Sequence, residues 1–481
     1  MKAILVFVLS VSCLFNLFGQ KKMNPEKLIS DFDYLIEELR LQHQGLYEYL
    51  PEHEVNKEID SIRKTLNVPK TKLEFYRTLR YTLGLTNEAH TSINLPKLTM
   101  IKIGLSKSFL PLAVKFCDKA LIITQNYGKN IVGLNKGSKL ISVNGEKISD
   151  IITKLFPLIP TDGFNETSRY EWTGGINFSL LYRLIYGKKK KFKLEIQEFG
   201  SKEIQTINIS PIIYTKFKGK NAKFKSADFD YTHFALQQIN DSVAYLCVPS
   251  FSSGEIAYES FYRSSFKKID SLNIKHLIID VQANDGGTEG NENLLFSYLT
   301  DSVIQKYKRV TMLPKPYSKN KHDKDYQADK WKLKNSLAER GTFTLFSNYY
   351  SDLEYHKPNK DHIFKGNVYV LISGTTFSGG AEFASLVKMS DRGVFIGDEA
   401  GGAYEGNVSG YSESIKLPNS KIQISIPTVH FQVNVNPKVK GSGVIPDYEI
   451  PQTWEAYLKR NNRKKDFAIE LITKTANKGF R

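Results

Sequence analysis

The chain has 481 residues, a hydrophobic fraction of 41% and a formal net charge of +17, and this length predicts about two to four domains. With 29 Phe and 26 Tyr it can build packed cores, which argues against an intrinsically disordered protein. The basic runs KKKK (188–191) and KRNNRKK (459–465) come without a nucleic-acid recognition motif. We therefore expect solvated surfaces that an anionic envelope could attract, and no nucleic-acid partner.

Residues 1–20 have the pattern of a secretory signal peptide. A basic residue precedes an apolar stretch that ends at a small residue, Gly19, followed by polar sequence. This order predicts cleavage near residues 19–20 and export to the periplasm or the extracellular space. An anchoring helix is the alternative, since the apolar run nearly reaches the length of a bilayer span. Lipid modification of Cys13 is disfavoured because apolar residues continue to Phe18. No later segment is long enough to cross a membrane, so we expect a mature protein that is soluble outside the cytoplasm.

Two cysteines, Cys117 and Cys247, remain after cleavage. Each lies in an apolar, strand-like stretch, which predicts buried thiols, with one disulfide as the alternative in an oxidising compartment. No paired Cys or His spacing occurs, so the sequence predicts no metal site and no cofactor.

Residues 21–100 are predicted to form an N-terminal helical region. Asn24-Pro25-Glu26 combines a capping residue, a first-turn proline and an acid at the positive end of the helix dipole. Thr71 and Glu74 form a capping box before a second helix. Pro96 closes the region.

Residues 101–212 are predicted to form a β-rich module. Short strand-like runs alternate with Gly and Asn, and the stretch GLNKGSKLISVNGEKISDIITKLF gives a glycine turn, a strand, an Asn-Gly turn and a helix. This order resembles a PDZ domain, a resemblance that implies binding of extended peptides at a sheet edge. A structural β-insert with a closed groove is the alternative.

Residues 225–455 alternate apolar strands with helices, which predicts an α/β core containing parallel strands covered on both faces. Residues 310–362 are polar and irregular, and we expect a surface insertion there. Residues 456–481 predict a basic, helical C-terminal tail. The expected fold class is therefore a multidomain α/β protein.

Two strand-to-helix turns in this core contain candidate chemistry. LIIDVQANDGG ends in Gly286-Gly287, where backbone N–H groups can approach a ligand closely. TTFSGGAEFA places Ser378 at the start of a helix, whose N-terminal N–H groups stabilise an anion. A phosphate site suits the first turn equally well, and a simple N-cap suits the serine.

Four motifs taken together resemble the tail-specific (C-terminal processing) serine peptidases, in particular the branch related to the tricorn core and the interphotoreceptor retinoid-binding proteins. They are LTNEAHTSI (85–93), DVQANDGG (280–287), TTFSGGAEFA (375–384) and GSGVIPD (441–447). With the PDZ-like module, the resemblance covers nearly all of the mature chain. It implies a ClpP/crotonase-like peptidase core.

The resemblance implies a nucleophile, an oxyanion hole and a base. Ser378 is the implied nucleophile, and the implied oxyanion hole uses N–H groups of Gly286 or Gly287 and of Gly379. The lysine base of many members is missing from the corresponding stretch, GDEAGGAYEG. In the tricorn-like branch a histidine of the N-terminal part is the base, which implies His90 here. Glu382 falls at the family's acidic position.

The chain departs from the family pattern at several positions. The arginine of the Gly-Gly turn is Gln282, with consequences for substrate carboxylate binding or for local support. The branch's glutamate before the G-V-x-P-D segment is also missing, so the acid that would orient His90 is open between Glu88 and Glu405. Two alternative bases, Lys388 and His430, lie in the middle of a helix and of a strand and are expected to be structural.

The expected function is that of a secreted serine endopeptidase that hydrolyses extended polypeptides through an acyl-Ser378 intermediate. The PDZ-like module would engage the substrate near a free C-terminus. Two alternatives are a catalytically silent ligand- or peptide-binding protein on the same scaffold and a PDZ-type adaptor whose core merely supports the module.

Overall fold

The protein is described by a computed structural model that covers residues 22–128, 133–218, 232–254, 256–312, 337–339, 342–344 and 355–478. The signal peptide predicted for residues 1–20 lies outside these ranges. Among the helices within them, none combines the length and the apolar composition needed to span a bilayer.

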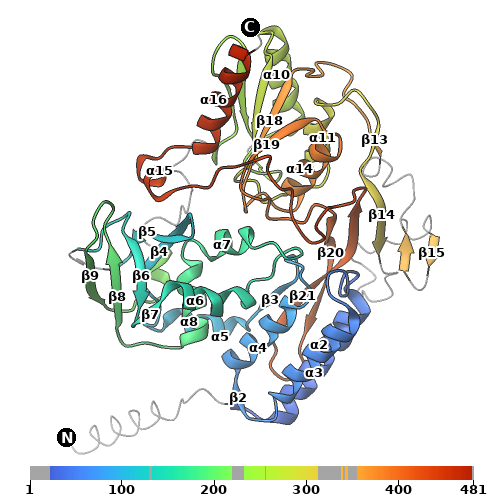
Figure 1. The fold of residues 1–481 in the computed structure, drawn as a ribbon. Coiled ribbons are helices and arrows are strands. Elements are labelled where there is room, and N and C mark those ends of the chain that lie inside the picture. The colour runs from blue at the N-terminus through green and yellow to red at the C-terminus, as the bar shows by residue number, and fades with distance from the viewer. Residues whose placement is uncertain are drawn as a thin grey trace, which may run out of the picture.

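A six-stranded sheet forms the centre of the α/β core (Figure 1). Its strands, in spatial order, are β10 (Ala235–Gln238), β11 (Val243–Cys247), β12 (His276–Asp280), β18 (Asn367–Ile372), β19 (Gly393–Gly397) and β22 (Tyr448–Glu449). All neighbouring pairs are parallel except the antiparallel edge pair β10–β11. The predicted alternation of parallel strands and helices is confirmed.

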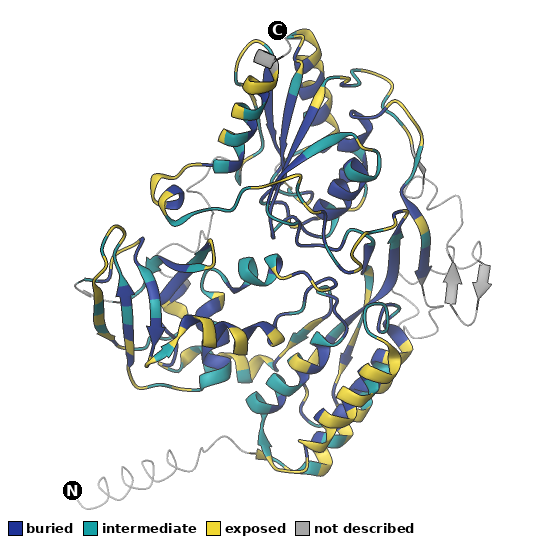
Figure 2. Cartoon of the chain, in the orientation of Figure 1, coloured by how far each residue is buried: buried dark blue, intermediate teal, exposed yellow. Residues whose placement is uncertain are grey.

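Helices cover both faces of this sheet. One face packs against α10 (Tyr258–Ser271), α11 (Asn291–Ser297) and α14 (Gly379–Met389). The opposite face packs against α16 (Arg463–Lys478), which buries Ala468 and Ile472 on the strands (Figure 1). Burial on both faces explains why the interior positions of the central strands are apolar (Figure 2).

A second, antiparallel sheet lies beside the core. It contains β14 (Tyr307–Met312), β20 (Gly406–Lys416) and β21 (Gln423–Val433), with β15 (Leu337–Glu339) and β16 (Thr342–Thr344) at one end. The predicted start of the surface insertion (310–362) is too early in the chain, because Val310 is fully buried in β14. Much of the remaining insertion lies outside the described residues.

The N-terminal helices α2 (Pro25–Gln42), α3 (Glu52–Lys64) and α4 (Lys72–Gly84) pack against the second sheet, where Phe32 and Phe75 share a buried cluster with Ile424. The predicted caps are present: the Asn24 side chain accepts from Lys27 N, and both bonds of the Thr71–Glu74 capping box form. A further helix, α5 (Lys97–Leu105), continues beyond Pro96 and was not expected.

The β-rich module is a separate antiparallel sheet of β4 (Leu112–Cys117), β5 (Ala120–Asn126), β6 (Lys139–Val143), β8 (Phe192–Gln197) and β9 (Ile204–Ile209), with β7 (Glu146–Lys147) paired to β6. Its helices are α6 (Ile148–Leu155), α7 (Thr167–Thr173) and α8 (Asn177–Tyr186). The predicted order of strand, Asn144-Gly145 turn and helix is present.

The edge strand of this module is partly occupied by the chain itself. Val114 of β4 donates to Gly175 O at 3.1 Å, and Gly175 N donates back to Val114 O at 2.6 Å. A peptide adding to β4 would compete with this pairing. At Val114 the edge of β4 is therefore already paired.

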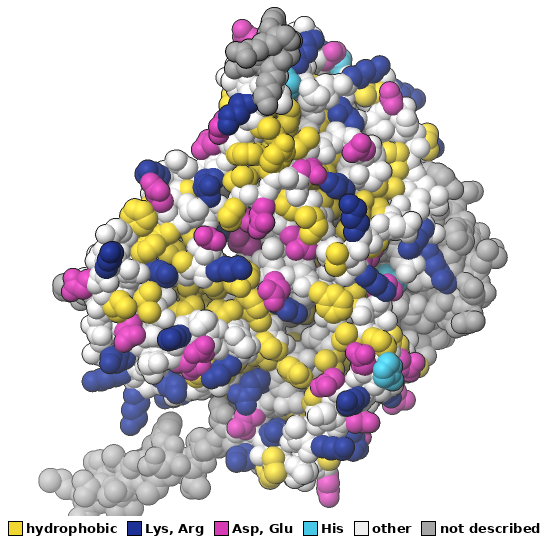
Figure 3. Space-filling model, in the orientation of Figure 1, with side chains coloured by type: hydrophobic (Ala, Val, Ile, Leu, Met, Phe, Trp, Pro, Cys, Tyr) yellow, Lys and Arg dark blue, Asp and Glu magenta, His cyan; other side chains and the backbone are white. Residues whose placement is uncertain are grey.

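Two expectations about side chains have different outcomes. Cys117 and Cys247 are buried and form no disulfide among the described residues, as predicted. The basic run 459–465 is not wholly solvated, because Lys464 is buried and its Nζ donates to Ile372 O at 2.8 Å and to Asp398 Oδ2 at 2.7 Å. Elsewhere, lysine and arginine side chains are spread among acidic ones over the visible face of the molecule (Figure 3).

Candidate active site

Ser378 lies in the turn between β18 and α14, directly before the first residue of the helix. Its backbone has φ 51° and ψ −125°, a left-handed conformation that costs a non-glycine residue energy. Its side chain makes no capping hydrogen bond to α14. The structure therefore does not use this serine as an ordinary N-cap.

His90 lies beside this serine although 288 residues separate the two. Its Nε2 is 3.1 Å from Ser378 Oγ, within hydrogen-bond distance. Two contacts hold the histidine there. The strand that follows it, β3 (Ser92–Asn94), pairs with β21, and its ring stacks on Phe377 with centroids 4.9 Å apart.

Glu88 is the acid that contacts His90. Its Oε1 lies 2.6 Å from His90 Nδ1 and also accepts from His90 N at 3.0 Å. Its Oε2 accepts from Val408 N at 2.7 Å. Glu405, the other candidate from the sequence, instead accepts from Gly441 N at 2.6 Å.

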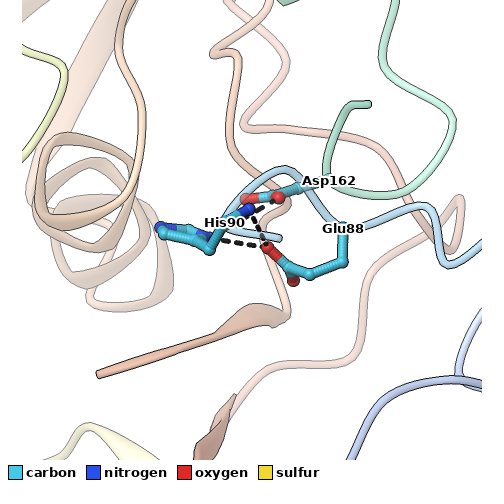
Figure 4. A group of neighbouring side chains, drawn as sticks. All are labelled: Glu88, His90 and Asp162. Atoms are coloured by element: carbon cyan, nitrogen blue, oxygen red, sulfur yellow. Dashed lines mark hydrogen bonds and ion pairs between the residues drawn. The ribbon is translucent and has the colours of Figure 1, made fainter. Parts of the chain in front are cut away.

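A second carboxyl group, Asp162, lies behind this pair (Figure 4). It comes from the loop before α7 of the β-rich module, accepts from Ala89 N at 2.9 Å and lies 4.0 Å from His90 Nδ1. No sequence signal singled it out, because it lies in an irregular loop 73 residues after Ala89 along the chain.

The pKa values of the two carboxyl groups are shifted in opposite directions. Burial would raise the pKa of Glu88, but His90, Asp162 and the Val408 N–H outweigh burial and hold the pKa at about 2. Burial and the neighbouring Glu88 charge raise the pKa of Asp162 well above its ordinary value. Of the two carboxyl groups, Glu88 is therefore the one that ionises readily, and Asp162 is the one that holds its proton more strongly.

The same three side chains place donor atoms within 4.8 Å of one another, a spacing that a metal ion could use. His90 Nδ1 is already bonded to Glu88, and Nε2 faces Ser378. A metal at this position would therefore displace the contact that orients the histidine. The arrangement fits acid–base chemistry.

The Gly286-Gly287 turn lies against the serine. A Cβ added to Gly286 (φ 102°) would lie 2.7 Å from Ser378 Cβ, so no larger residue fits. Gly286 N donates to Asn284 Oδ1 at 2.9 Å. Among the described residues, none accepts a hydrogen bond from the N–H of Gly287 or Gly379. These two N–H groups are the donors left for an oxyanion.

Glu382 holds the first turn of α14 in place. It accepts from Lys306 Nζ and Tyr307 Oη, both at 2.6 Å, and from Asn407 Nδ2 at 3.0 Å. Lys306 is fully buried and also contacts Glu292 at 2.9 Å. Sequence reasoning missed this lysine, since its partners come from distant segments.

The structure places the remaining sequence candidates away from the serine. Lys388 pairs with Asp447 at 2.9 Å, and His430 is buried in β21. Gln282 is buried, and its Nε2 donates to Asp280 Oδ2 at 2.9 Å and to Asn462 Oδ1 at 3.2 Å. It supports the turn locally and does not face a substrate.

Comparisons with known proteins identify a matching family model and similar solved structures. Residues 242–450 match the family model described as Peptidase family S41. No curated protein matches the chain. Mature CPAF has a similar structure, with a TM-score of 0.65, 15% identity, and coverage of 93% of this chain and 96% of that one.

Two further solved structures are similar. Mature CPAF complexed with lactacystin has a TM-score of 0.65, 14% identity, and coverage of 93% of this chain and 97% of that chain. The tricorn protease has a TM-score of 0.39 and 14% identity, over 94% of this chain and 37% of that chain. The CPAF structures show a shared fold along almost the whole chain.

Proposed function

Since residues 242–450 place this chain in peptidase family S41, the tail-specific serine peptidases, we propose that it is an endopeptidase with Ser378 as nucleophile and His90 as base. The observation that carries the proposal is the hydrogen-bonded series from Ser378 Oγ to His90 Nε2, at 3.1 Å, and from His90 Nδ1 to Glu88, at 2.6 Å. This is the order nucleophile, base and orienting acid that acyl transfer requires.

Acylation starts with proton transfer from Ser378 Oγ to neutral His90 Nε2 while Oγ bonds to the carbonyl carbon of the substrate. The carbonyl oxygen becomes an oxyanion that faces the N–H groups of Gly287 and Gly379. The imidazolium is stabilised by Glu88, a full carboxylate at neutral pH. His90 then gives the proton to the leaving nitrogen, the C–N bond breaks, and an acyl-Ser378 ester remains.

Deacylation repeats these steps with water. His90 takes a proton from the water, whose oxygen bonds to the ester carbon, and the second tetrahedral oxyanion faces the same two N–H groups. The proton returns to Ser378 Oγ as the ester bond breaks. The peptide leaves as a carboxylic acid, and both side chains regain their starting states.

Export and C-terminal engagement belong to this proposal. The signal-peptide pattern of residues 1–20 supports an exported enzyme, periplasmic or extracellular. The β-rich module contributes Asp162 to the candidate active site. This contact supports a role for the module in binding the substrate. We propose that the substrate is an extended polypeptide engaged near its free C-terminus.

Labelling by a fluorophosphonate probe tests the nucleophile and the base. We expect the mature protein to be labelled, the Ser378→Ala variant to lose labelling, and the His90→Ala variant to be labelled far more slowly. Ser390→Ala is the matched control, since Ser390 lies at the other end of α14 and donates to Leu386 O. Persistent labelling of Ser378→Ala would refute the assignment. An unlabelled wild type that also leaves peptides uncut would favour the binding-protein alternative.

A further inference from the structure

Helix α5 carries apolar side chains on the outside of the protein, and none of its nine residues is buried. Four of these side chains have a large exposed fraction: Leu98 (74%), Met100 (54%), Ile101 (46%) and Leu105 (63%). Leu98, Ile101 and Leu105 follow one another at intervals of three and four residues, so they lie along one side of the helix. Apolar residues occupy its other side as well. Exposed apolar surface of this kind marks a site of interaction.

Two other segments lie next to α5 at the same end of the molecule. Residues of α4, α5 and α8 line one apolar cavity of about 470 Å³, so these three helices are neighbours. Strand β2 (Lys70–Thr71) directly precedes α4, and the basic run 188–191 follows α8. Figure 1 shows β2, α5 and α8 at the end of the molecule away from α10 and α16. We call the surface formed by α5, β2 and residues 188–191 the α5 face.

The α5 face is basic. The three chain segments that contribute to it contain no Asp or Glu, and these are residues 61–73, 89–117 and 172–194. Five lysines of the face are exposed, and no described residue forms an ion pair with them: Lys97, Lys102, Lys188, Lys190 and Lys191. Their charge is complementary to an extended anionic surface. A protein partner would need an acidic side chain opposite each lysine, whereas an anionic bilayer presents negative charge everywhere.

The described chain also begins at this end of the molecule. Strand β1 (Lys22–Met23) pairs with β2, and Lys22 lies opposite Thr71. The residues before Lys22 have the pattern of a signal peptide, and they join the protein here. An N-terminal anchor, the alternative to cleavage, would hold the same face against the bilayer.

We propose that the α5 face binds an anionic lipid bilayer, with Leu98, Ile101 and Leu105 inserted at the acyl boundary and the lysines at the headgroups. Helices that lie in a membrane interface combine apolar residues that enter the boundary with lysines beside them. A helix of nine residues inserts few side chains, so charge and insertion must act together, and the binding is reversible. The inference is independent of the peptidase proposal, because no residue of the candidate active site belongs to the α5 face.

Co-sedimentation with lipid vesicles tests the role of charge. The mature chain, residues 21–481, is used so that the apolar segment 1–20 cannot itself bind lipid. Vesicles of equimolar phosphatidylglycerol and phosphatidylcholine are compared with pure phosphatidylcholine, and we expect at least about 10-fold stronger binding to the anionic vesicles. Each lysine at such a surface strengthens binding about fivefold, so Lys97→Gln with Lys102→Gln should weaken it about 10- to 30-fold. Lys267→Gln with Lys268→Gln, two exposed lysines of α10, is the matched control and should change it little.

A second pair of variants tests the insertion of apolar side chains. Leu98→Gln with Leu105→Gln should weaken binding to the anionic vesicles about 10-fold or more without changing the net charge. Val303→Gln with Val439→Gln is the matched control, since these two valines are 62% and 64% exposed and lie outside the α5 face. A polarity-sensitive dye attached to Leu98→Cys should be quenched by brominated lipid.

Three outcomes would overturn the proposal. The first is equal binding to both kinds of vesicle, or equal losses in the variants of the α5 face and in their controls. The second is an unchanged affinity of the leucine pair together with an unquenched dye, which would show adsorption by charge without insertion. The third is a dimer that forms without lipid and that the leucine pair dissociates, which would identify a second copy of the chain as the occupant. An unchanged melting temperature verifies that each variant folds.

Discussion

Replacing Glu88 by Gln tests the acid of the proposed triad. Both carboxylate oxygens are acceptors, with His90 on Oε1 and Val408 N on Oε2. An amide can accept on only one side, so it must present its NH₂ group either to the backbone or to the histidine. In the second case the tautomer of His90 is reversed and Nε2 can no longer take the serine proton.

The expected loss can be worked from the contact. Glu88 Oε1 and His90 Nδ1 are 2.6 Å apart. With both charges spread over several atoms, an effective separation of about 4 Å and a dielectric constant of about 20 give ~4 kcal/mol of attraction. Without that attraction the imidazolium transition state is destabilised by a similar amount, which corresponds to a loss of ~10³-fold in kcat.

The assay is kcat for cleavage of a fluorogenic peptide, supported by circular dichroism to verify folding. Glu405→Gln is the matched control, because Glu405 is a half-buried acid of the same region that bonds Gly441 N and not His90. We expect this control to stay near wild-type activity. A folded Glu88→Gln variant with kcat within about 10-fold of wild type would refute the reasoning.

The remaining predictions concern pH and buried charge. Burial holds the pKa of His43 at about 4 instead of 6.5, so the unfolded chain protonates first and stability is lost as pH falls from 6.5 towards 4, by up to about 3 kcal/mol. Urea unfolding should show this slope flattened in His43→Leu, and an equal slope would contradict the assignment. Asp162, with its raised pKa, ionises only as pH rises, beside the charge of Glu88. Wild-type kcat/KM should therefore decline as pH rises through the ionisation of Asp162, and Asp162→Asn should keep its activity at lower pH without that decline; a decline shared by both proteins would count against the assignment. Lys306→Met leaves two buried carboxylates without their cation and should cost about 3–5 kcal/mol of unfolding free energy, whereas exposed Lys308→Met should cost little. A Lys306→Met cost no greater than that of the control would show that the carboxylates do not need this cation.

The sequence predicted the part of the candidate site that lies in the strand-to-helix turns of the core. Ser378 and the glycines occupy strand-to-helix turns of a parallel sheet, and the carboxyl ends of such strands meet at one edge. The strands, the N-terminal caps and the parallel order followed from local patterns. His90 was identified by its motif alone. Local sequence patterns cannot predict that it contacts Ser378, which follows 288 residues later in the chain.

The partners of His90 were beyond local reasoning. Glu88 contacts the ring from a turn in which the preceding residue, Asn87, has φ 47°. Asp162 arrives from an irregular loop of another module. Helix α5 was missed because it buries no residue, so its apolar positions show no helical stripe. The sequence predicts a solvated Lys464, but this residue lies in the first turn of α16 and its Nζ donates to Ile372 O.

The pairing of β3 with β21 has a consequence for biosynthesis. Ser92 pairs with Ser425, so the segment that fixes the histidine is synthesised early and its docking strand late. A ribosome must release nearly the whole polypeptide before Ser378 and His90 can meet. The pair proposed for catalysis is thus assembled only when β3 docks on β21, late in the folding of the chain.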